Sequence, residues 1–481
     1  MTNETHRPVV AHRDPLASSL VAYASCAVRL EDSQMVLERP TVTPTHDAPT
    51  FVFATNSPRS LRLSLTSTYL STHTHTHTPA SMKGRFIVNP FQELNLSGPD
   101  RTQLEDLANQ CIASNYERFV KFASPTCGAH PRAVNSSRWK LYKEGEKLKV
   151  YSERLETTLG AADDEPTGSG LPMLLCTGTM EGKLDDLMFG LISENLETMR
   201  VKASYVDDIS GAAVLEDVFL PTEEKPFQSL VIKWMELDIP FRSTKYVKNR
   251  DYVYLEGTGF ISGVQGERVA YHLLHSVSFP QTHPLPNRIR ANMSVVAFWR
   301  QIGNNTMEMY ATGVMDPVDS GMVCKLVVSS LANVFMSSLK YAYCGQMRKL
   351  TFMLDKRYCE SRMHGTPNRN RVCVTCMTPL SKRRIGDFGK SNNSCKLCFG
   401  FVCNACKIAR KLSFVDPDLL LSQRKVTFCT ACISEVTSMS AAEVARANIM
   451  AQKIHLGERL SFMKSLVSDD STLDASSSSG Y

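Results

Sequence analysis

The 481-residue chain has no uninterrupted apolar run that approaches 18 residues, so we expect no segment that crosses a membrane. It also lacks the signatures of several enzyme classes: a phosphate-binding loop, GxSxG and HExxH. Two GxG runs, Gly168–Gly170 and Gly257–Gly259, lack the rest of a nucleotide-binding fingerprint. His272, His275 and His283 have no partner indicated by the sequence, and we interpret them as ordinary strand or loop histidines. We therefore predict that the chain is not an enzyme.

Charge of either sign is modest. The chain has 54 Lys and Arg and 48 Asp and Glu, a net charge of +6, and 43% of its residues are apolar. This composition is typical of globular proteins, and the length allows two or three domains. The CxxC pairs are not accompanied by an HxxxH helix or by stacking aromatic residues, so we do not expect nucleic-acid binding.

Residues 1–81 are rich in Ser, Thr, Pro and His and include the alternating run His73–Thr78. Such a segment cannot bury enough apolar surface to offset its ordering entropy, so we expect disorder. The stretch Leu16–Val28 faintly resembles a signal-peptide core, but it begins late, is interrupted by serines and follows acidic residues. We therefore reject a signal peptide. Met82 is an alternative natural start.

Cysteine is present in an unusual arrangement. Of the 15 cysteines, 8 form four CxxC pairs within 60 residues: Cys373/Cys376, Cys395/Cys398, Cys403/Cys406 and Cys429/Cys432. Four thiolates complete a closed tetrahedral zinc site, so eight predict two structural zinc ions with no open position for chemistry. The alternative is a disulfide-stapled module, although nothing else in the sequence indicates an oxidising compartment.

The order of the pairs carries a further signal, because only four residues, Phe399–Val402, separate the second and third pairs and long gaps flank this block. Over residues 365–436 this order resembles a FYVE zinc finger. The resemblance implies a small two-zinc module in which the first and third pairs share one ion and the second and fourth share the other. The first set is Cys373, Cys376, Cys403 and Cys406, and the second is Cys395, Cys398, Cys429 and Cys432.

The lipid-reading motif of that family is largely missing. Where FYVE domains carry a basic RRHHCRxCG run, this chain has Ser391–Gly400, in which only Lys396 keeps the charge. Residues 365–436 nevertheless contain twelve Lys or Arg and four Asp or Glu. The resemblance places a membrane-contacting loop at Lys382, Arg383, Arg384 and Phe388. We expect these residues and Lys396 to bind an anionic membrane surface, the alternative being a solvated basic face.

The region before the cysteines has a different pattern. Residues 97–122 have helical spacing of apolar residues, 183–195 read as a short helix, and 321–350 read as one long helix. Many of the expected strands alternate apolar and polar residues, as a sheet with one face toward an interior requires. The expected strands are Trp139–Arg154, Met173–Met180, Ala213–Leu220, Gln228–Glu236, Asp251–Ile261, Arg268–Phe279, Asn292–Gln301 and Thr306–Val314.

Three motifs in this region resemble START domains. They are Val247–Glu256, similar to an NRDxVYL strand start, His275–Pro280 at a strand exit, and Asp316–Gly321 before the long helix. The resemblance covers residues 92–357. It implies an α+β helix-grip fold, a curved antiparallel sheet with a long C-terminal helix, that holds one lipid or sterol ligand between sheet and helix.

A cavity with apolar walls favours a lipid over water. We predict that it is lined by inward-facing residues of the strands and of the long helix, the alternative being that these fill a closed core. The candidate lipid-binding residues are Trp234, Phe298, Met309, Val327, Leu331 and Val334.

Two further segments end the chain: an expected amphipathic helix at 440–467 and an acidic, Ser-rich tail at 468–481 that we expect to be disordered. Together, the two resemblances imply a cytoplasmic lipid-binding protein, peripheral on intracellular membranes such as endosomes. The alternatives are a scaffold whose cysteine module binds a protein partner and, because cross-braced zinc folds resemble one another, a ubiquitin ligase. The four-residue central gap argues against the ligase.

Overall fold

The structure of the chain, a computed structural model, describes residues 27–31, 34–38, 89–123, 134–154, 173–206, 211–237, 248–316, 318, 321–365, 371–380, 394–415 and 420–453. Of segment 1–81 it describes only β1 (Ala27–Glu31) and β2 (Gln34–Glu38), a hairpin that pairs with β9 in parallel. The predicted disorder of the rest of this segment, and of the tail, lies outside the described residues.

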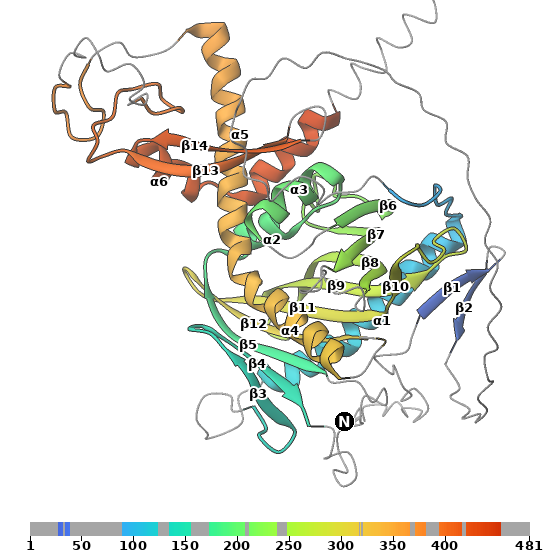
Figure 1. Ribbon diagram of the computed structural model, residues 1–481. Coiled ribbons are helices and arrows are strands. Elements are labelled where there is room, and N and C mark those ends of the chain that lie inside the picture. Colours follow the sequence, from blue (N-terminus) through green and yellow to red (C-terminus); the bar gives the residue numbers. More distant parts are fainter. Residues whose placement is uncertain are drawn as a thin grey trace, which may run out of the picture.

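A large sheet forms the centre of the molecule (Figure 1). Its strands are ordered β3-β4-β5-β12-β11-β9-β8-β7-β6, each antiparallel to its neighbours, and β10 pairs with β8. The strands are β3 (Trp139–Glu144), β4 (Leu148–Glu153), β5 (Leu174–Glu181), β6 (Gly211–Phe219), β7 (Ser229–Leu237), β8 (Asn249–Ser262), β9 (Arg268–Ser278), β10 (Arg288–Arg290), β11 (Met293–Gly303) and β12 (Thr306–Met315). The predicted α+β helix-grip arrangement of sheet and long C-terminal helix is confirmed. The expected strand over 139–154 is instead the hairpin β3–β4, because Gly145 donates a backbone hydrogen bond to Leu148 and closes a turn.

Helices cover both faces of this sheet (Figure 1). On one face lies α1 (Gly98–Ala123), which begins at a capping box: Ser97 and Asp100 exchange side-chain and backbone hydrogen bonds. On the other face lie α2 (Leu184–Leu191), α3 (Leu196–Tyr205) and α4 (Met322–Ser337). The expectation that only one sheet face meets an interior was therefore wrong. Strands buried on both faces need apolar residues at consecutive positions, as β8 shows.

The predicted single helix over 321–350 is two helices. After α4, a 3₁₀ turn at Ser338–Lys340 leads into α5 (Tyr341–His364), which extends well beyond the expected end. The hydroxyls of Ser337 and Ser338 donate to the carbonyls of Val334 and Phe335, three residues back, and this local bonding accompanies the tighter turn. Likewise, the expected helix over 183–195 is α2 followed by α3, which begins at a capping box of Asn195 and Thr198.

By length and composition alone, the helical stretch Met322–His364 is apolar enough to cross a membrane. Val327, Leu331 and Phe335 of this stretch pack in the core against the sheet. One such stretch is weak evidence for a span, and a third of its apolar window (33%) is buried within the protein.

The cysteine module, residues 371–438, packs against α5 beyond the sheet domain (Figure 1). It contains the hairpin of β13 (Ile408–Val415) and β14 (Leu421–Phe428) and the helix α6 (Thr430–Ser438). A final helix over 441–453 returns to the sheet domain, where Ala441, Val444 and Ala445 join the buried core. The rest of the expected helix 440–467 lies outside the described residues.

Candidate ligand cavity and metal centres

A cavity of about 70 Å³ lies between the sheet and the α4–α5 segment. Five methionines and several aliphatic or aromatic side chains form most of its wall, and a small group of charged residues forms the remainder. The methionines are Met199, Met235, Met293, Met309 and Met315, and the charged group comprises Lys202, Lys233, Glu256 and His272. The cavity is therefore apolar with one polar end.

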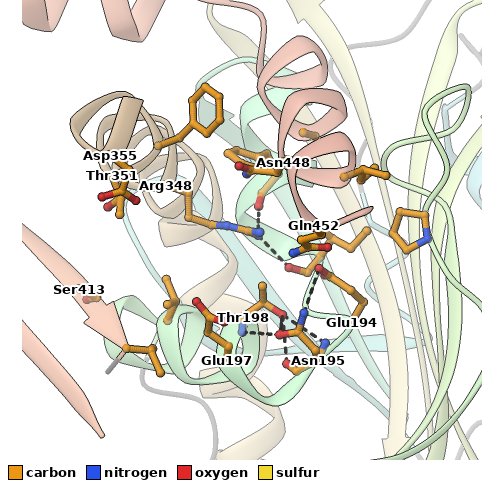
Figure 2. Close-up of a pocket in the computed structure, with 18 of the residues that line it drawn as sticks. Glu194, Asn195, Glu197, Thr198, Arg348, Thr351, Asp355, Ser413, Asn448 and Gln452 are labelled. Atoms are coloured by element: carbon orange, nitrogen blue, oxygen red, sulfur yellow. Dashed lines mark hydrogen bonds between the residues drawn. The ribbon is translucent and has the colours of Figure 1, made fainter. Parts of the chain in front are cut away.

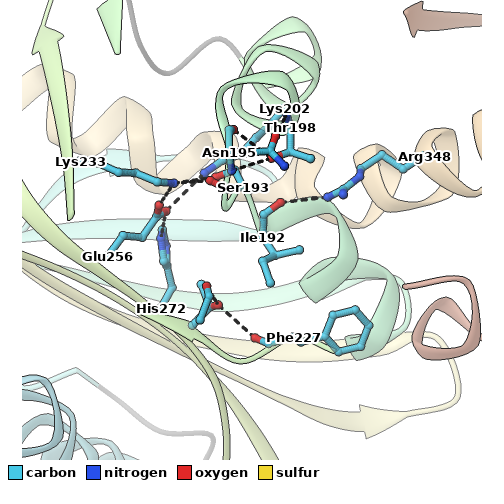
Figure 3. A network of polar contacts seen from close by, with 12 residues as sticks. Ile192, Ser193, Asn195, Thr198, Lys202, Phe227, Lys233, Glu256, His272 and Arg348 are labelled. Atoms are coloured by element: carbon cyan, nitrogen blue, oxygen red, sulfur yellow. Dashed lines mark hydrogen bonds and ion pairs between the residues drawn. The ribbon is translucent and has the colours of Figure 1, made fainter. Parts of the chain in front are cut away.

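The charged group is held by short contacts (Figure 3). Lys233 Nζ donates to the two oxygens of Ser193 and to Glu256 Oε2, and His272 Nε2 lies 2.7 Å from Glu256 Oε1. Lys202 Nζ lies 3.8 Å from the same carboxylate. The two strand residues Lys233 and Glu256 sit on neighbouring strands β7 and β8, and His272 follows on β9, so the sheet itself brings them together.

Burial and neighbouring charges together set the protonation states of Glu256 and His272. Burial alone would raise the pKa of Glu256, but the nearby Lys233 and Lys202 charges outweigh it, and the pKa lies below its usual range. Burial lowers the pKa of His272, which its hydrogen bond to Glu256 only partly opposes. An ionised carboxylate only accepts hydrogen bonds, so the neutral imidazole carries its proton on Nε2. The polar end therefore presents fixed charges within an apolar cavity.

The predicted lipid-binding residues divide into three groups. Met309, Leu331 and Val334 line the cavity. Val327 is fully buried in the same core without lining it. Trp234 and Phe298 lie on the opposite sheet face, where Phe298 stacks on Phe119 of α1 at 5.5 Å, so the structure places these two away from the cavity.

Sequence reasoning missed the charged residues of the cavity. His272 was interpreted as unpaired, but it pairs with Glu256, and His275 contacts Ser294. The available signal was Lys233 and Glu256, each flanked by apolar residues on its strand, which marks a buried charge pair.

The eight paired cysteines form two groups of four. One contains Cys373, Cys376, Cys403 and Cys406, the other Cys395, Cys398, Cys429 and Cys432, the same sets that the FYVE resemblance implied. Within each group the four sulfurs lie within 4.8 Å of one another. Cys376 and Cys403 are 3.7 Å apart, and Cys398 and Cys429 are 3.9 Å apart. Sulfurs bound tetrahedrally to one zinc ion lie about 3.8 Å apart, so the donor sets fit Zn²⁺.

A tight backbone loop holds each of the first two cysteine pairs, Cys373/Cys376 and Cys395/Cys398. Single bridges of Val372 with Pro379 and of Ser394 with Phe401 close tight loops around them. Met377 and Phe399, which follow the second cysteine of each pair, have positive φ angles of 59° and 58°. Non-glycine residues rarely adopt this conformation, which turns the chain sharply and leaves both thiols on one side.

Of the predicted membrane-binding residues, the structure describes only Lys396. Its side chain is half-buried and its backbone N–H donates to Thr427 O at 3.0 Å. Lys382, Arg383, Arg384 and Phe388 lie outside the described residues. Membrane binding at these positions stays a prediction.

The cysteine module is bonded directly to the sheet domain. Lys349 of α5 is fully buried, pairs with Asp186 of α2 at 2.7 Å, and donates to the carbonyls of Thr437 and Met439 at the end of α6. Tyr205 Oη accepts a hydrogen bond from Ser413 N at 2.8 Å. These contacts join the two parts around α5.

Comparisons with known proteins add partial likenesses in fold. No family model matches the chain, and no curated protein matches it. The chain is similar to the solved structure of human StAR-related lipid transfer protein 5, with 14% identity, a TM-score of 0.34, and coverage of 50% of this chain and 98% of that one. For human STARD10 the values are 13%, 0.31, 54% and 85%, and for the Zhui aromatase/cyclase from a Streptomyces species they are 11%, 0.22, 36% and 94%.

Proposed function

We propose that the chain binds one lipid that has an apolar body and a polar end, in the cavity between the sheet and α4. The observation that supports this is the composition of the cavity wall: methionine and aliphatic side chains along most of it, and Lys233, Glu256 and His272 at one end. An apolar body would contact the methionines. A hydroxyl or carbonyl would exchange hydrogen bonds with the charged group, whose members are already fixed.

The cavity must enlarge to admit such a ligand. Its volume, about 70 Å³, is well below the ~300–1,000 Å³ of ordinary ligand pockets. Methionine side chains are unbranched and adaptable, so their rotation creates space at small cost. Leu331, Val334 and Phe335 of α4 form another wall, and displacement of α4 would widen the cavity further.

We further propose that the two cysteine groups hold Zn²⁺ and that the cysteine module directs the chain to an anionic membrane in the cytoplasm. The support is the sulfur spacing and the basic composition of residues 365–436, with twelve Lys or Arg against four Asp or Glu. Two Zn(Cys)₄ centres each carry a charge of about −2, so the metal-loaded module keeps a net positive charge. The chain has no proposed catalytic role.

A second candidate function is a protein-interaction scaffold. The small cavity volume favours it, because a filled sheet domain has no room for cargo and would serve as a rigid support. In that case the cysteine module would bind a protein partner.

Native mass spectrometry of the full chain, expressed with zinc and followed by lipid extraction, separates these candidates. We expect two metal ions and one bound lipid. Val334→Phe should reduce the lipid while retaining both metals, because Val334 lines the cavity. Val323→Phe on the same helix is the matched control, since Val323 does not line it. Two metals without lipid, even after incubation with mixed liposomes, would favour the scaffold.

A further inference from the structure

A second and larger cavity, of about 460 Å³, lies where the sheet domain meets the cysteine module. We call it the junction cleft. Five segments form its walls: the α2–α3 corner, the β6–β7 connection with Pro221 and Pro226, α5, the β13–β14 hairpin and the helix over 441–453 (Figure 2). Its volume lies within the usual range for small-molecule sites, which occur preferentially between domains.

The walls are held in place by contacts outside the cleft lining as well as within it. Lys349 joins α2, α5 and α6, as described above. Arg446 of the terminal helix donates to the carbonyl of Glu223 at 2.9 Å, and Lys453 pairs with the Glu223 carboxylate at the same distance. The cleft is therefore a fixed feature of the docked domains.

Three hydrogen-bond donors of the lining are used within the protein, whereas the side-chain amides of Asn448 and Gln452 make no hydrogen bond among the described residues. Arg348 donates to the carbonyls of Phe189 and Ile192 and stacks over the Phe189 ring at 4.3 Å (Figure 2). The Thr351 hydroxyl donates to Met347 O at 3.2 Å, and the Ser413 hydroxyl pairs with that of Ser204 at 2.6 Å. A ligand cannot recruit these donors without breaking an existing bond.

Carboxylates of the lining keep open acceptor positions. Glu194 Oε1 accepts a hydrogen bond from Asn195 Nδ2 at 3.4 Å, whereas its Oε2 is buried and has no hydrogen-bond partner among the described residues. Asp355 stands across the cleft from Glu194 (Figure 2); it is exposed to solvent, and within the described part of the chain no ion pair or hydrogen bond reaches its carboxylate. Burial raises the pKa of Asp355, since no nearby cation offsets the desolvation. Glu197 is a third carboxylate in the lining.

Apolar surface accompanies these acceptors. Phe352, Phe414 and Ile449 contribute side chains to the lining. Arg424 lies 5.8 Å from the centre of the Phe414 ring and is exposed to solvent, so its charge remains hydrated. Phe352 has no such cation among the described residues, and an aromatic face without one attracts a positively charged group.

We propose that the junction cleft binds a small organic ammonium ion with an apolar body, whose N–H groups donate to Glu194 or Asp355 while its body contacts Phe352 and Ile449. A carboxylate with an open acceptor position gains a charge-assisted hydrogen bond, and the ligand bridges the sheet domain and the cysteine module. This site is separate from the lipid cavity and does not depend on lipid binding.

Isothermal titration calorimetry of the zinc-loaded full chain tests the proposal with three probes of similar shape: 2-phenylethylammonium, 2-phenylethanol and 3-phenylpropionate. We expect saturable 1:1 binding of the ammonium, with affinity about tenfold above the alcohol, because only the ammonium adds a charge-assisted contact worth about 1.4 kcal/mol.

Glu194→Gln combined with Asp355→Asn should remove this preference while leaving the cleft shape intact. Glu443→Gln, an exposed carboxylate outside the lining, should leave it unchanged.

Three results would overturn the proposal. Equal affinities for the ammonium and the alcohol would show that the carboxylates contribute nothing. Preference for the propionate would assign the cleft to anions through Arg424. Ammonium binding that survives the double variant but is lost in the cavity variant Val334→Phe would place the probe in the lipid cavity and would likewise overturn the junction-cleft assignment.

Discussion

Glu256 and Lys233 are each almost completely shielded from solvent, and their pairing offsets a desolvation cost that neither charge could bear alone. Apolar side chains of the same volume would give at least equal stability. What the pair provides is a fixed polar position inside an apolar cavity. His272 extends that position, since its imidazole is oriented by the same carboxylate.

The neutral state of His272 predicts a pH dependence of folding. Burial lowers its pKa in the folded state, whereas in the unfolded chain the value is about 6.5. Below about pH 6.5 the unfolded chain therefore takes up a proton that the folded chain does not, and stability falls as the pH falls toward the folded-state pKa. Between pH 7.5 and 5.5 we expect the free energy of unfolding to drop by about 1 kcal/mol from this residue. Urea unfolding at several pH values measures it.

His272→Gln should flatten this dependence, because the amide does not titrate and can still donate to Glu256. His364→Gln, at the exposed end of α5, serves as the control and should retain the slope. Glu256 does not obscure the result. Its pKa is depressed on folding, so its contribution is complete above the unfolded value of about 4.3 and is lost only at lower pH. An equal slope in both variants would contradict the assignment to His272.

Among the elements, α2 and α5 approach each other unusually closely, and two glycines permit it. A Cβ atom at Gly345 would lie 1.9 Å from Asp186 O, and one at Gly190 would lie 1.9 Å from Tyr341 O. No side chain fits at either position without separating the helices. The α2–α5 contact in turn places Asp186 beside Lys349, which binds the cysteine module.

Gly345→Ala should therefore destabilise the protein although alanine is the better helix former. Overpacking of a tight contact costs about 1–3 kcal/mol, and the gain in helix propensity returns at most about 1 kcal/mol. Gly303→Ala is the matched control, because its Cβ would meet only the Thr306 side chain at 3.7 Å. Urea unfolding midpoints compare the two. A Gly345→Ala protein as stable as the parent would mean that the helices separate freely.

The elements that sequence reasoning predicted well are those with a strong local pattern. Strands β7, β8, β9, β11 and β12 agree with their expected ranges within about two residues, because long apolar runs bounded by polar turns define them. The CxxC spacing likewise indicated the eight clustered cysteines, and the FYVE resemblance implied the two groups of four that the structure brings together. These features depend on a few neighbouring residues.

The features that sequence reasoning missed depend on distant partners. The Lys233–Glu256–His272 group requires the pairing of β7, β8 and β9, which no single segment reveals. Trp234 and Phe298 were predicted to line the cavity, but a strand buried on both faces gives no alternation from which to choose the inward side. Lys349 looks like an ordinary helix lysine until α2 and α6 are in place.

At the scale of the whole molecule, the second cysteine group and the sheet domain are linked through α6. The helix follows Cys429, a member of that group, and the Thr437 and Met439 carbonyls at its end accept hydrogen bonds from Lys349. Loss of metal from this group would release α6 and leave the buried charges of Lys349 and Asp186 less well satisfied, at a cost of up to ~3 kcal/mol.

Removal of metal with a chelator should therefore speed amide hydrogen exchange in α2 and α5 as well as in the cysteine module, by about tenfold. Cys429→Ser should reproduce this effect, whereas Cys376→Ser, in the more exposed group, should loosen mainly the module itself. Mass-spectrometric exchange resolves the two regions. Unchanged exchange in α2 after chelation would show that the parts fold independently.

The helix α5 also fixes a direction in space. It runs without interruption for 24 residues, about 36 Å, from the end of α4 away from the sheet and past the β13–β14 hairpin (Figure 1). Each residue of an α-helix turns the chain by about 100°, so one extra residue between Tyr341 and Lys349 would swing the module about a quarter-turn around the helix axis. The number of residues in α5 thus sets the rotational position of the cysteine module about the helix axis relative to the sheet domain.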